Sequence, residues 1–302
     1  MLWTEKYRPQ RLIDIIGQDK FVNDAQTWKE HGMPNVLLYG IAGTGKTAAG
    51  GALANEILGD NLSGNYFEIN ASDDRRLETV RTTIKEIATS MKVGNVPHKI
   101  VLLDEMDGMT PDAQNALKRI MERYSHNIRF VITTNNRNKI IIPLQSRCAN
   151  YLFSKLSNQD IEFVLSKILS EEDIEGISQD DLEMFIPVVG GDLRRAITEL
   201  QASVASKTPL TIQITRMMEP YDNIMEQIIS QQYENALKEI NDLLSLSVDM
   251  KTVCINLHES VMGMELGSPV KFKLLRVIGE AEWRSSNMTP KLLAAWMVGQ
   301  MI

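Results

Sequence analysis

The sequence lacks the features that mark membrane proteins, secreted disulfide scaffolds and metal centres. No apolar run approaches the ~18 residues that would span a bilayer. The first residues carry no long apolar stretch, so we expect no secretory signal. Two cysteines, Cys148 and Cys254, cannot build a disulfide framework, which favours a reducing, cytoplasmic location. The four scattered histidines show no metal-ligand spacing.

The charge balance argues against one kind of partner. Lys and Arg number 32 and Asp and Glu number 39, which gives a net charge of −7. A protein that coats nucleic acid over its whole surface would be basic, so that class is disfavoured. A local basic strip inside a ring or groove is still compatible with this charge. The 302 residues suffice for two or three domains with their own cores, and no internal repeat or low-complexity tract is evident.

Apolar patterning divides the chain into three parts. Over residues 1–155, short apolar runs alternate with helical patterns, which predicts βαβ units and a mostly parallel α/β sheet. The sequence then turns helical, first over 156–207 and again over 208–302, where apolar residues recur at helical spacing. Four predicted strands lie at 35–39, 66–70, 99–103 and 128–133, and three predicted short helices lie at 160–169, 178–185 and 192–203.

A phosphate-binding loop is indicated by one octapeptide between a predicted strand and a predicted helix. It reads Gly40-Ile41-Ala42-Gly43-Thr44-Gly45-Lys46-Thr47, the pattern G-x-x-x-x-G-K-[ST]. Glycines let backbone N–H groups approach phosphate oxygens, and the following helix N-terminus adds positive potential. Lys46 would reach the β- and γ-phosphates, and Thr47 would offer its hydroxyl to Mg²⁺. The alternative is a glycine-rich turn that binds nothing, which the flanking strand and helix disfavour.

Polar residues follow two later strands. Asp104 and Glu105 end the apolar run 100–103; Asp104 would hold Mg²⁺ and Glu105 would polarise an attacking water. Such an acidic pair is often only a solvated turn, but a phosphate loop upstream favours a catalytic role. Asn135 follows the run 131–134, at the strand end where α/β sheets bind ligands, and could orient the same water. A simple loop amide is its alternative.

Together these residues resemble the AAA+ ATPases, specifically the small subunits of clamp loaders of the replication factor C type. The resemblance covers nearly the whole chain, and its Ser-Arg-Cys triplet is more specific than the phosphate loop. Where the family usually has two prolines, this chain has Ile41 and Ala42, a change that should not disturb backbone cradling of phosphate. Other segments in the family's order are 3–9 (WTEKYRP), 16–18 (IGQ), 70–73 (NASD), 104–107 (DEMD), 112–117 (DAQNAL), 146–148 (SRC), 191–195 (GDLRR) and 278–284 (IGEAEWR).

The resemblance implies an AAA+ core over 1–155, a small helical lid over 156–207 and an all-helical collar over 208–302. It implies that Arg147 is a finger directed at the γ-phosphate of the neighbouring subunit, a role that requires an oligomer. Arg194 would be a lid sensor that contacts the nucleotide in cis, and the segment containing Arg8 would border the base. An ordinary surface arginine is the alternative for Arg147 and for Arg194.

A DNA-facing strip is also implied by the resemblance. In the family, two helices line the inner channel of a spiral and track the phosphates of primed DNA, which binds DNA without reading its sequence. Taken alone, each basic pair would more simply be a solvated helix face. The basic residues of the two corresponding segments are Arg75, Arg81, Lys85, Lys118 and Arg119.

The implied function is ATP- and Mg²⁺-dependent loading of a sliding clamp onto primer-template DNA. The implied partners are the clamp, a larger loader subunit and further copies of this chain, with no membrane. One alternative is another oligomeric AAA+ motor, such as a branch-migration helicase. A second is a structural subunit that binds ATP without hydrolysing it, but intact Lys46, Glu105 and Asn135 favour turnover.

Overall fold

The computed structural model describes residues 1–71, 77–245 and 248–302 and divides the chain into two compact units. The first unit combines Met1–Glu172 with Gly191–Gln201, and the second combines Asp173–Gly190 with Ala202–Ile302. The division into core, lid and collar at residues 155 and 207 stays a prediction.

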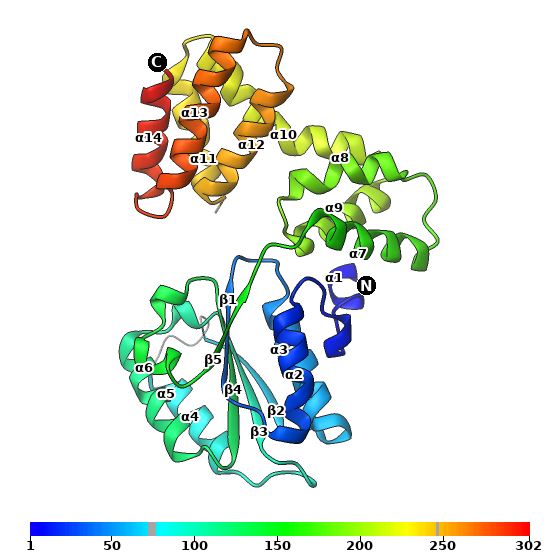
Figure 1. Cartoon of the computed structure of the whole chain (residues 1–302), viewed down its shortest axis with the longest axis vertical. Coiled ribbons are helices and arrows are strands. Elements are labelled where there is room, and N and C mark those ends of the chain that lie inside the picture. The colour runs from blue at the N-terminus through cyan, green and yellow to red at the C-terminus, as the bar shows by residue number, and fades with distance from the viewer. Residues whose placement is uncertain (72–76, 246–247) are drawn as a thin grey trace. The chain divides into compact units, whose positions relative to one another are not determined.

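Within the described residues, five parallel strands form the sheet of the first unit (Figure 1). Four of them coincide with the predicted runs, so the mostly parallel α/β sheet is confirmed. The strand β5 was not predicted, because Asn150 leaves only three consecutive apolar residues in it, Tyr151, Leu152 and Phe153. The order is β2-β3-β4-β1-β5, with β1 (Val36–Gly40), β2 (Tyr66–Asn70), β3 (Lys99–Asp104), β4 (Ile128–Thr134) and β5 (Ala149–Phe153).

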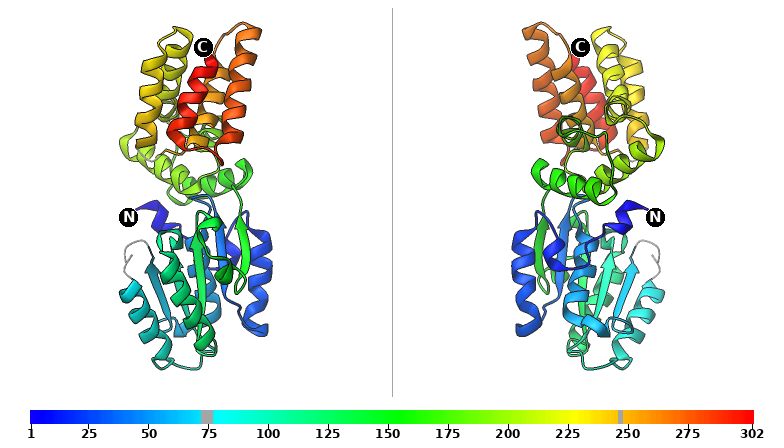
Figure 2. Two further views of the ribbon diagram at one scale, coloured as in Figure 1. Left: turned by 90° about the vertical axis from the view of Figure 1, so that its left-hand side faces the viewer. Right: turned by 90° about the vertical axis from the view of Figure 1, so that its right-hand side faces the viewer.

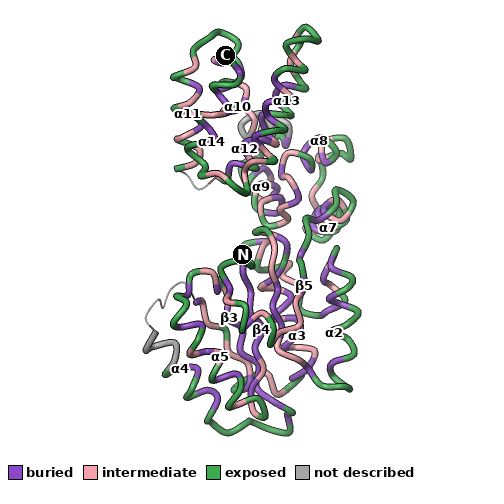
Figure 3. Tube along the Cα trace, turned by 60° about the vertical axis from the view of Figure 1, so that its left-hand side comes forward, coloured by how far each residue is buried: buried purple, intermediate pink, exposed green. Residues whose placement is uncertain are grey.

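Helices cover both faces of this sheet (Figure 1 and Figure 2). Successive strand residues point to opposite faces, so Val36 and Leu38 join one buried cluster while Leu37 joins the other. Figure 3 shows that β3 and β4, which have neighbours on both sides and both faces, are buried over most of their length. One face carries α2 (Asp19–His31) and α3 (Lys46–Leu58); the other carries α4 (Leu77–Thr89), α5 (Pro111–Arg123) and α6 (Ile142–Gln145).

The first unit also contains helices and short turns outside these two layers. The helix α7 (Asn158–Glu171) begins at a capping box in which Ser157 and Asp160 bond each other's backbone N–H groups. The helix α9 (Leu193–Ser206) begins within this unit, and the short α1 (Trp3–Lys6) precedes the sheet. Short 3₁₀ turns lie at Leu12–Asp14, Gly59–Asn61, Met106–Gly108 and Arg137–Lys139.

The second unit is helical, as the spacing of its apolar residues predicted. Its C-terminal helices lie side by side in both views of Figure 2 and share one buried cluster that includes Ile224, Leu257 and Met297. Among the described helices of the chain, none is both long and apolar enough to cross a membrane. The unit contains α8 (Gln179–Val189), α10 (Leu210–Ile229), α11 (Tyr233–Ser245), α12 (Met250–Gly263), α13 (Ser268–Arg284) and α14 (Pro290–Met301).

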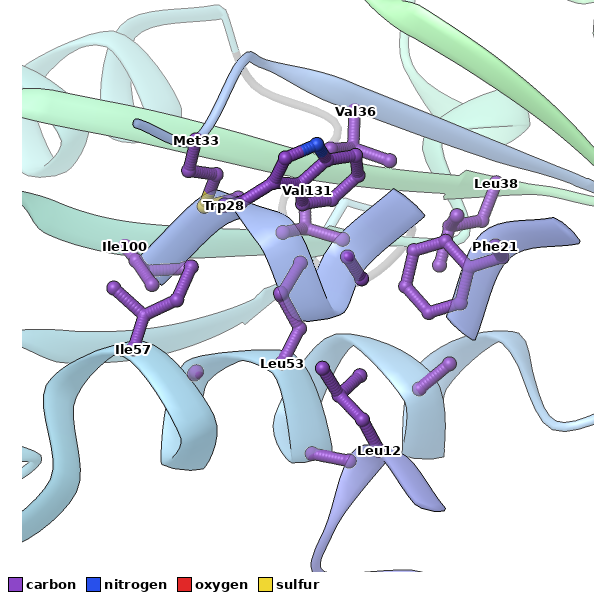
Figure 4. Packing of buried hydrophobic residues seen from close by; sticks show 14 of the residues in the cluster. Leu12, Phe21, Trp28, Met33, Val36, Leu38, Leu53, Ile57, Ile100 and Val131 are labelled. Carbon is purple, nitrogen blue, oxygen red and sulfur yellow. The ribbon is translucent and has the colours of Figure 1, made fainter. Parts of the chain in front are cut away.

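An aromatic cluster joins α2 to the edge strand β5. The ring of Phe21 lies 5.4 Å from the rings of Tyr151 and Phe153 and 6.0 Å from that of Trp28, at the tilted and edge-on angles that aromatic pairs prefer. Figure 4 shows Phe21 and Trp28 among the aliphatic side chains of α3 and the strands. The Tyr151 hydroxyl donates to Asp24 Oδ2 at 2.9 Å, so the polar end of this cluster is satisfied.

Truncation of Phe21 tests this packing. Phe21 is 2% exposed, so Phe21→Ala should lower the free energy of unfolding by about 3–5 kcal/mol through lost burial and the cavity left behind. Urea unfolding followed by circular dichroism measures this loss. The matched control is Phe272→Ala, at a phenylalanine that is 70% exposed, where we expect a change below about 0.5 kcal/mol. Equal losses in the two variants would contradict the assigned core.

Candidate active site

The candidate site lies at the carboxyl ends of β1, β3 and β4. The phosphate loop leaves β1, Asp104 ends β3, and Thr134 ends β4, which is placed between the other two strands. In a parallel sheet these ends share one edge, which is where α/β proteins bind ligands. They border a cavity of about 780 Å³ in the first unit, lined also by residues of 4–16, α7 and the start of α9.

The phosphate loop holds its lysine inside the loop. Gly45 adopts φ 90°, a left-handed conformation that suits glycine, and α3 begins directly after it. Lys46 is 7% exposed, and its Nζ donates to the carbonyl oxygens of Gly40 at 3.0 Å and Ile41 at 2.6 Å. The residues from Ala42 to Thr47 line the cavity. An ammonium group and a helix N-terminus thus meet at one point, which suits an anionic ligand.

Burial changes the acidity of this lysine. Removal from water disfavours the ammonium form and lowers the pKa of Lys46 from 10.5 to about 8. A ligand with negative charge would oppose this effect, because it would stabilise the charged form. Charged side chains nearby also act on it: Asp104, Asp107 and Asp192 raise the pKa, and Arg194 lowers it further.

The predicted magnesium ligands lie together. The Thr47 hydroxyl is 3.0 Å from both carboxylate oxygens of Asp104, and the Thr133 hydroxyl also donates to Asp104. Mg²⁺ prefers such oxygen groups and usually keeps several waters, so two protein groups beside a phosphate loop fit this ion. In the described residues, no group of three or more His, Cys, Asp or Glu side chains offers a cage made by the protein alone.

Glu105 and Asn135 both line the same cavity. Glu105 has φ 52°, a left-handed conformation that is uncommon for a residue with a side chain and is concentrated at functional sites. Its backbone N–H donates to Thr133 Oγ1 at 3.2 Å, which ties the ends of β3 and β4. The N–H of Asn135 donates to Asp107 Oδ1 at 3.4 Å. Their roles with an attacking water stay predictions.

The three predicted arginines divide into two groups. Arg8 and Arg194 line the cavity, and Arg8 lies 3.7 Å from Glu68. Arg147 is not among the described residues that line it. Arg147 instead lies in the turn directly after α6. Its Nε and Nη2 donate to Glu122, and its Nη1 donates to the carbonyl oxygen of Pro143 at 2.7 Å. Arg147 is therefore not positioned to act on the cavity of its own chain.

The structure adds residues that sequence reasoning did not assign. Thr133 contacts Asp104 and Glu105, and Asp107 accepts hydrogen bonds from Thr134 and Asn135. The signal for the threonines was their position at the end of an apolar run directly before Asn135. The sequence held no comparable signal for the α7 residues that line the cavity, among them Phe163 and Val164.

The predicted DNA-facing residues are only partly described. Arg75 lies in 72–76, outside the described residues, and the side chain of Arg81 is likewise not described. Lys85 on α4 and Arg119 on α5 are exposed, whereas Lys118 is half-buried. Lys85 and Arg119 thus have side chains accessible to a polyanion, and the assignment of all five to DNA stays a prediction.

The depressed pKa of Lys46 predicts a pH dependence of stability. Because the folded-state pKa lies near 8 and the ordinary value is 10.5, the unfolded state binds more protons between these pH values. The free energy of unfolding should therefore rise over this window, with Lys46 contributing up to about 3 kcal/mol. Lys46→Met should remove that contribution to the rise. Urea titrations at pH 7, 8.5 and 10 measure it.

The control for this prediction is Lys29→Met, at an exposed lysine on α2, which should keep the wild-type rise. A Lys46→Met variant whose stability follows the same pH curve as wild type would contradict the assigned desolvation.

Known proteins resemble this chain both in sequence and in fold. The model of the ATPase family associated with various cellular activities (AAA) matches residues 36–156. The replication factor C small subunit of Sulfurisphaera tokodaii is 39% identical over 294 residues, covering 94% of this chain and 89% of the relative. The replication factor C small subunit of Methanocella arvoryzae is 35% identical over 291 residues, covering 94% and 90%.

Among solved structures, the RuvB Holliday junction branch migration motor of Thermotoga maritima superposes with a TM-score of 0.60, covering 85% of this chain and 90% of that one. Its 19% identity shows a common fold alone. The phosphate loop, the acidic pair at the end of β3 and the high identity to the archaeal relatives over nearly the whole chain agree with one another. They confirm the resemblance drawn from the sequence: the chain belongs to the replication factor C small-subunit family of AAA ATPases.

Proposed function

We propose that this chain is an ATPase subunit of a clamp loader, which uses ATP to load a sliding clamp onto primer-template DNA. The observation that carries the proposal is the joining of Lys46, Thr47 and Asp104 at one edge of the sheet, in a chain of the replication factor C family. The implied partners are the clamp, a larger loader subunit and further copies of this chain.

In the proposed reaction, Lys46 and the N–H groups of the loop hold the β- and γ-phosphates of ATP. Mg²⁺, held by Thr47 and Asp104, would neutralise charge on these phosphates. Glu105 accepts a proton from a water that Asn135 orients, and the water oxygen bonds to the γ-phosphorus while the bond to the β–γ bridging oxygen breaks. ADP and inorganic phosphate leave.

The site of one chain is proposed to be completed by the next. Arg147 lies outside the cavity of its own chain, on the exposed turn after α6, and its partner Glu122 is exposed as well. A planar, permanently charged guanidinium suits the charge that develops on transferred phosphate. We therefore place Arg147 against the γ-phosphate of a neighbouring subunit, so that hydrolysis depends on assembly.

Two other functions are less well supported. A branch-migration motor rests on a likeness of fold alone. A subunit that binds ATP without turnover would need Lys46 for the phosphates, but it would not require Glu105 and Asn135 to line the same cavity. A cytoplasmic location stays a prediction. Both cysteines are free thiols, which is consistent with a reducing compartment.

Steady-state ATP hydrolysis tests the proposed function. The chain, assembled with its larger subunit, should hydrolyse ATP faster with primer-template DNA and faster still with the cognate clamp. Added salt should reduce the stimulation by DNA, because phosphate contacts release counterions. An ATP hydrolysis rate that does not change with DNA or clamp would contradict clamp loading. Separation of DNA strands by the chain would favour the branch-migration motor. Tight ATP binding without hydrolysis would favour the structural subunit.

Arg147→Ala tests completion by a neighbour. We expect ATP affinity near that of wild type and a kcat lower by about 10³-fold, since a finger acts on the transition state. Mixing Arg147→Ala with Lys46→Ala chains should restore part of the turnover at mixed interfaces. The matched control, Arg123→Ala on the exposed face of α5, should hydrolyse ATP normally. Wild-type turnover by Arg147→Ala would exclude the finger.

A further inference from the structure

The first turn of α9 is fixed by the side chain that precedes it. Asp192 accepts the backbone N–H of Arg195 on Oδ1 at 2.9 Å, and its carbonyl oxygen accepts the N–H of Ala196 at 3.0 Å. These are the bonds of a helix N-cap. Arg194, which lines the cavity, belongs to the same turn. The placement of Asp192 therefore determines where the Arg194 backbone lies.

The same carboxylate also touches the phosphate loop. A β-carbon built on Gly43 would lie 1.9 Å from Asp192 Oδ1 and 2.2 Å from Asp192 Cγ, far closer than atoms approach in proteins. Gly43 has φ 75°, so the backbone conformation favours glycine as well. A glycine at position 43 thus leaves the space in which the Asp192 carboxylate lies against the loop.

This contact has an electrostatic counterpart. Asp192 is one of the groups that raise the pKa of Lys46, together with Asp104 at the end of β3 and Asp107 in the turn after it. Arg194 acts in the opposite direction. The charges at the start of α9 are therefore close enough to influence the lysine of the phosphate loop.

We propose that Asp192 is a positioning residue for ATP hydrolysis: the side chain that caps α9 rests on Gly43 and so sets the separation between the phosphate loop and Arg194. The inference rests on the proposed role of Arg194 toward nucleotide. It differs from simple helix capping, which would stabilise α9 without linking it to the loop.

Substitutions at Asp192 separate contact from capping. In Asp192, Oδ1 both caps α9 and lies closest to Gly43. Asparagine keeps the cap and the shape of the carboxylate, serine can cap through its shorter Oγ but has no atom at the position of Oδ1, and alanine removes both. In the chain assembled with its partner subunits, Asp192→Asn should keep kcat within about threefold of wild type, while Asp192→Ser and Asp192→Ala should lower kcat about tenfold to a hundredfold. The KM for ATP should change much less than kcat.

The matched control removes a cap elsewhere. Asp249 caps α12 in the second unit, where it accepts the N–H of Thr252 at 3.0 Å. Asp249→Ser and Asp249→Ala should leave kcat unchanged. Melting temperatures are measured for every variant, and Asp192→Thr replaces Asp192→Ser if the serine variant is less stable than wild type.

Two outcomes would overturn the proposal. One is a wild-type kcat in a folded Asp192→Ser or Asp192→Thr variant. The other is a kcat of Asp192→Asn as low as that of Asp192→Ala.

A double variant distinguishes a failure of the positioning role of Asp192 from a failure of the proposed role of Arg194. If Asp192 acts through Arg194, then Asp192→Ser should not lower the kcat of Arg194→Ala any further, because both changes remove one interaction. If the fold-losses in kcat of the two single variants multiply in the double variant, the positioning role of Asp192 is overturned, while the proposed role of Arg194 stands. Wild-type turnover by Arg194→Ala would instead refute the proposed role of Arg194, and the inference with it.

Discussion

The Asp104 carboxylate is the interaction on which the architecture of the site depends. It accepts the hydroxyl of Thr47 at the start of α3 and that of Thr133 near the end of β4, so one side chain joins three elements. This meeting requires the sheet order, in which β4 lies between β1 and β3. A half-buried carboxylate needs such donors, since leaving it unpaired would cost several kcal/mol. The same oxygens are the ones that suit Mg²⁺.

Lys46 brings a positive charge to the site, in contrast to the negative charge of Asp104. Its ammonium is buried among loop carbonyls, and removal from water lowers its pKa. Positive charge held in this way is destabilising until an anion accompanies it, so binding of a phosphate chain and stability of the fold are linked. Asp104 and Lys46 thus bring one negative and one positive charge to the same cavity.

Segments far apart along the chain line the cavity. They are residues of 4–16, residues of α7, and Arg194 from α9. Asp192 connects that last segment directly to the phosphate loop at Gly43. Arg147, by contrast, is held on an exposed turn by Glu122, where a neighbouring chain can reach it. The structure thus separates Arg8 and Arg194, which line the cavity, from Arg147, which does not.

Local sequence was sufficient for the phosphate loop, four of the strands and the acidic pair, because each has a pattern with its own physical cause: glycines beside a lysine, continuous apolar runs, and charge at the end of a strand. It was insufficient for β5, where Asn150 leaves an apolar run of only three residues. The partners of Asp104, the lining from α7 and the contact between Asp192 and Gly43 were decided only by tertiary structure. Each joins residues that no spacing along the chain relates, since strand order and helix packing alone bring them together.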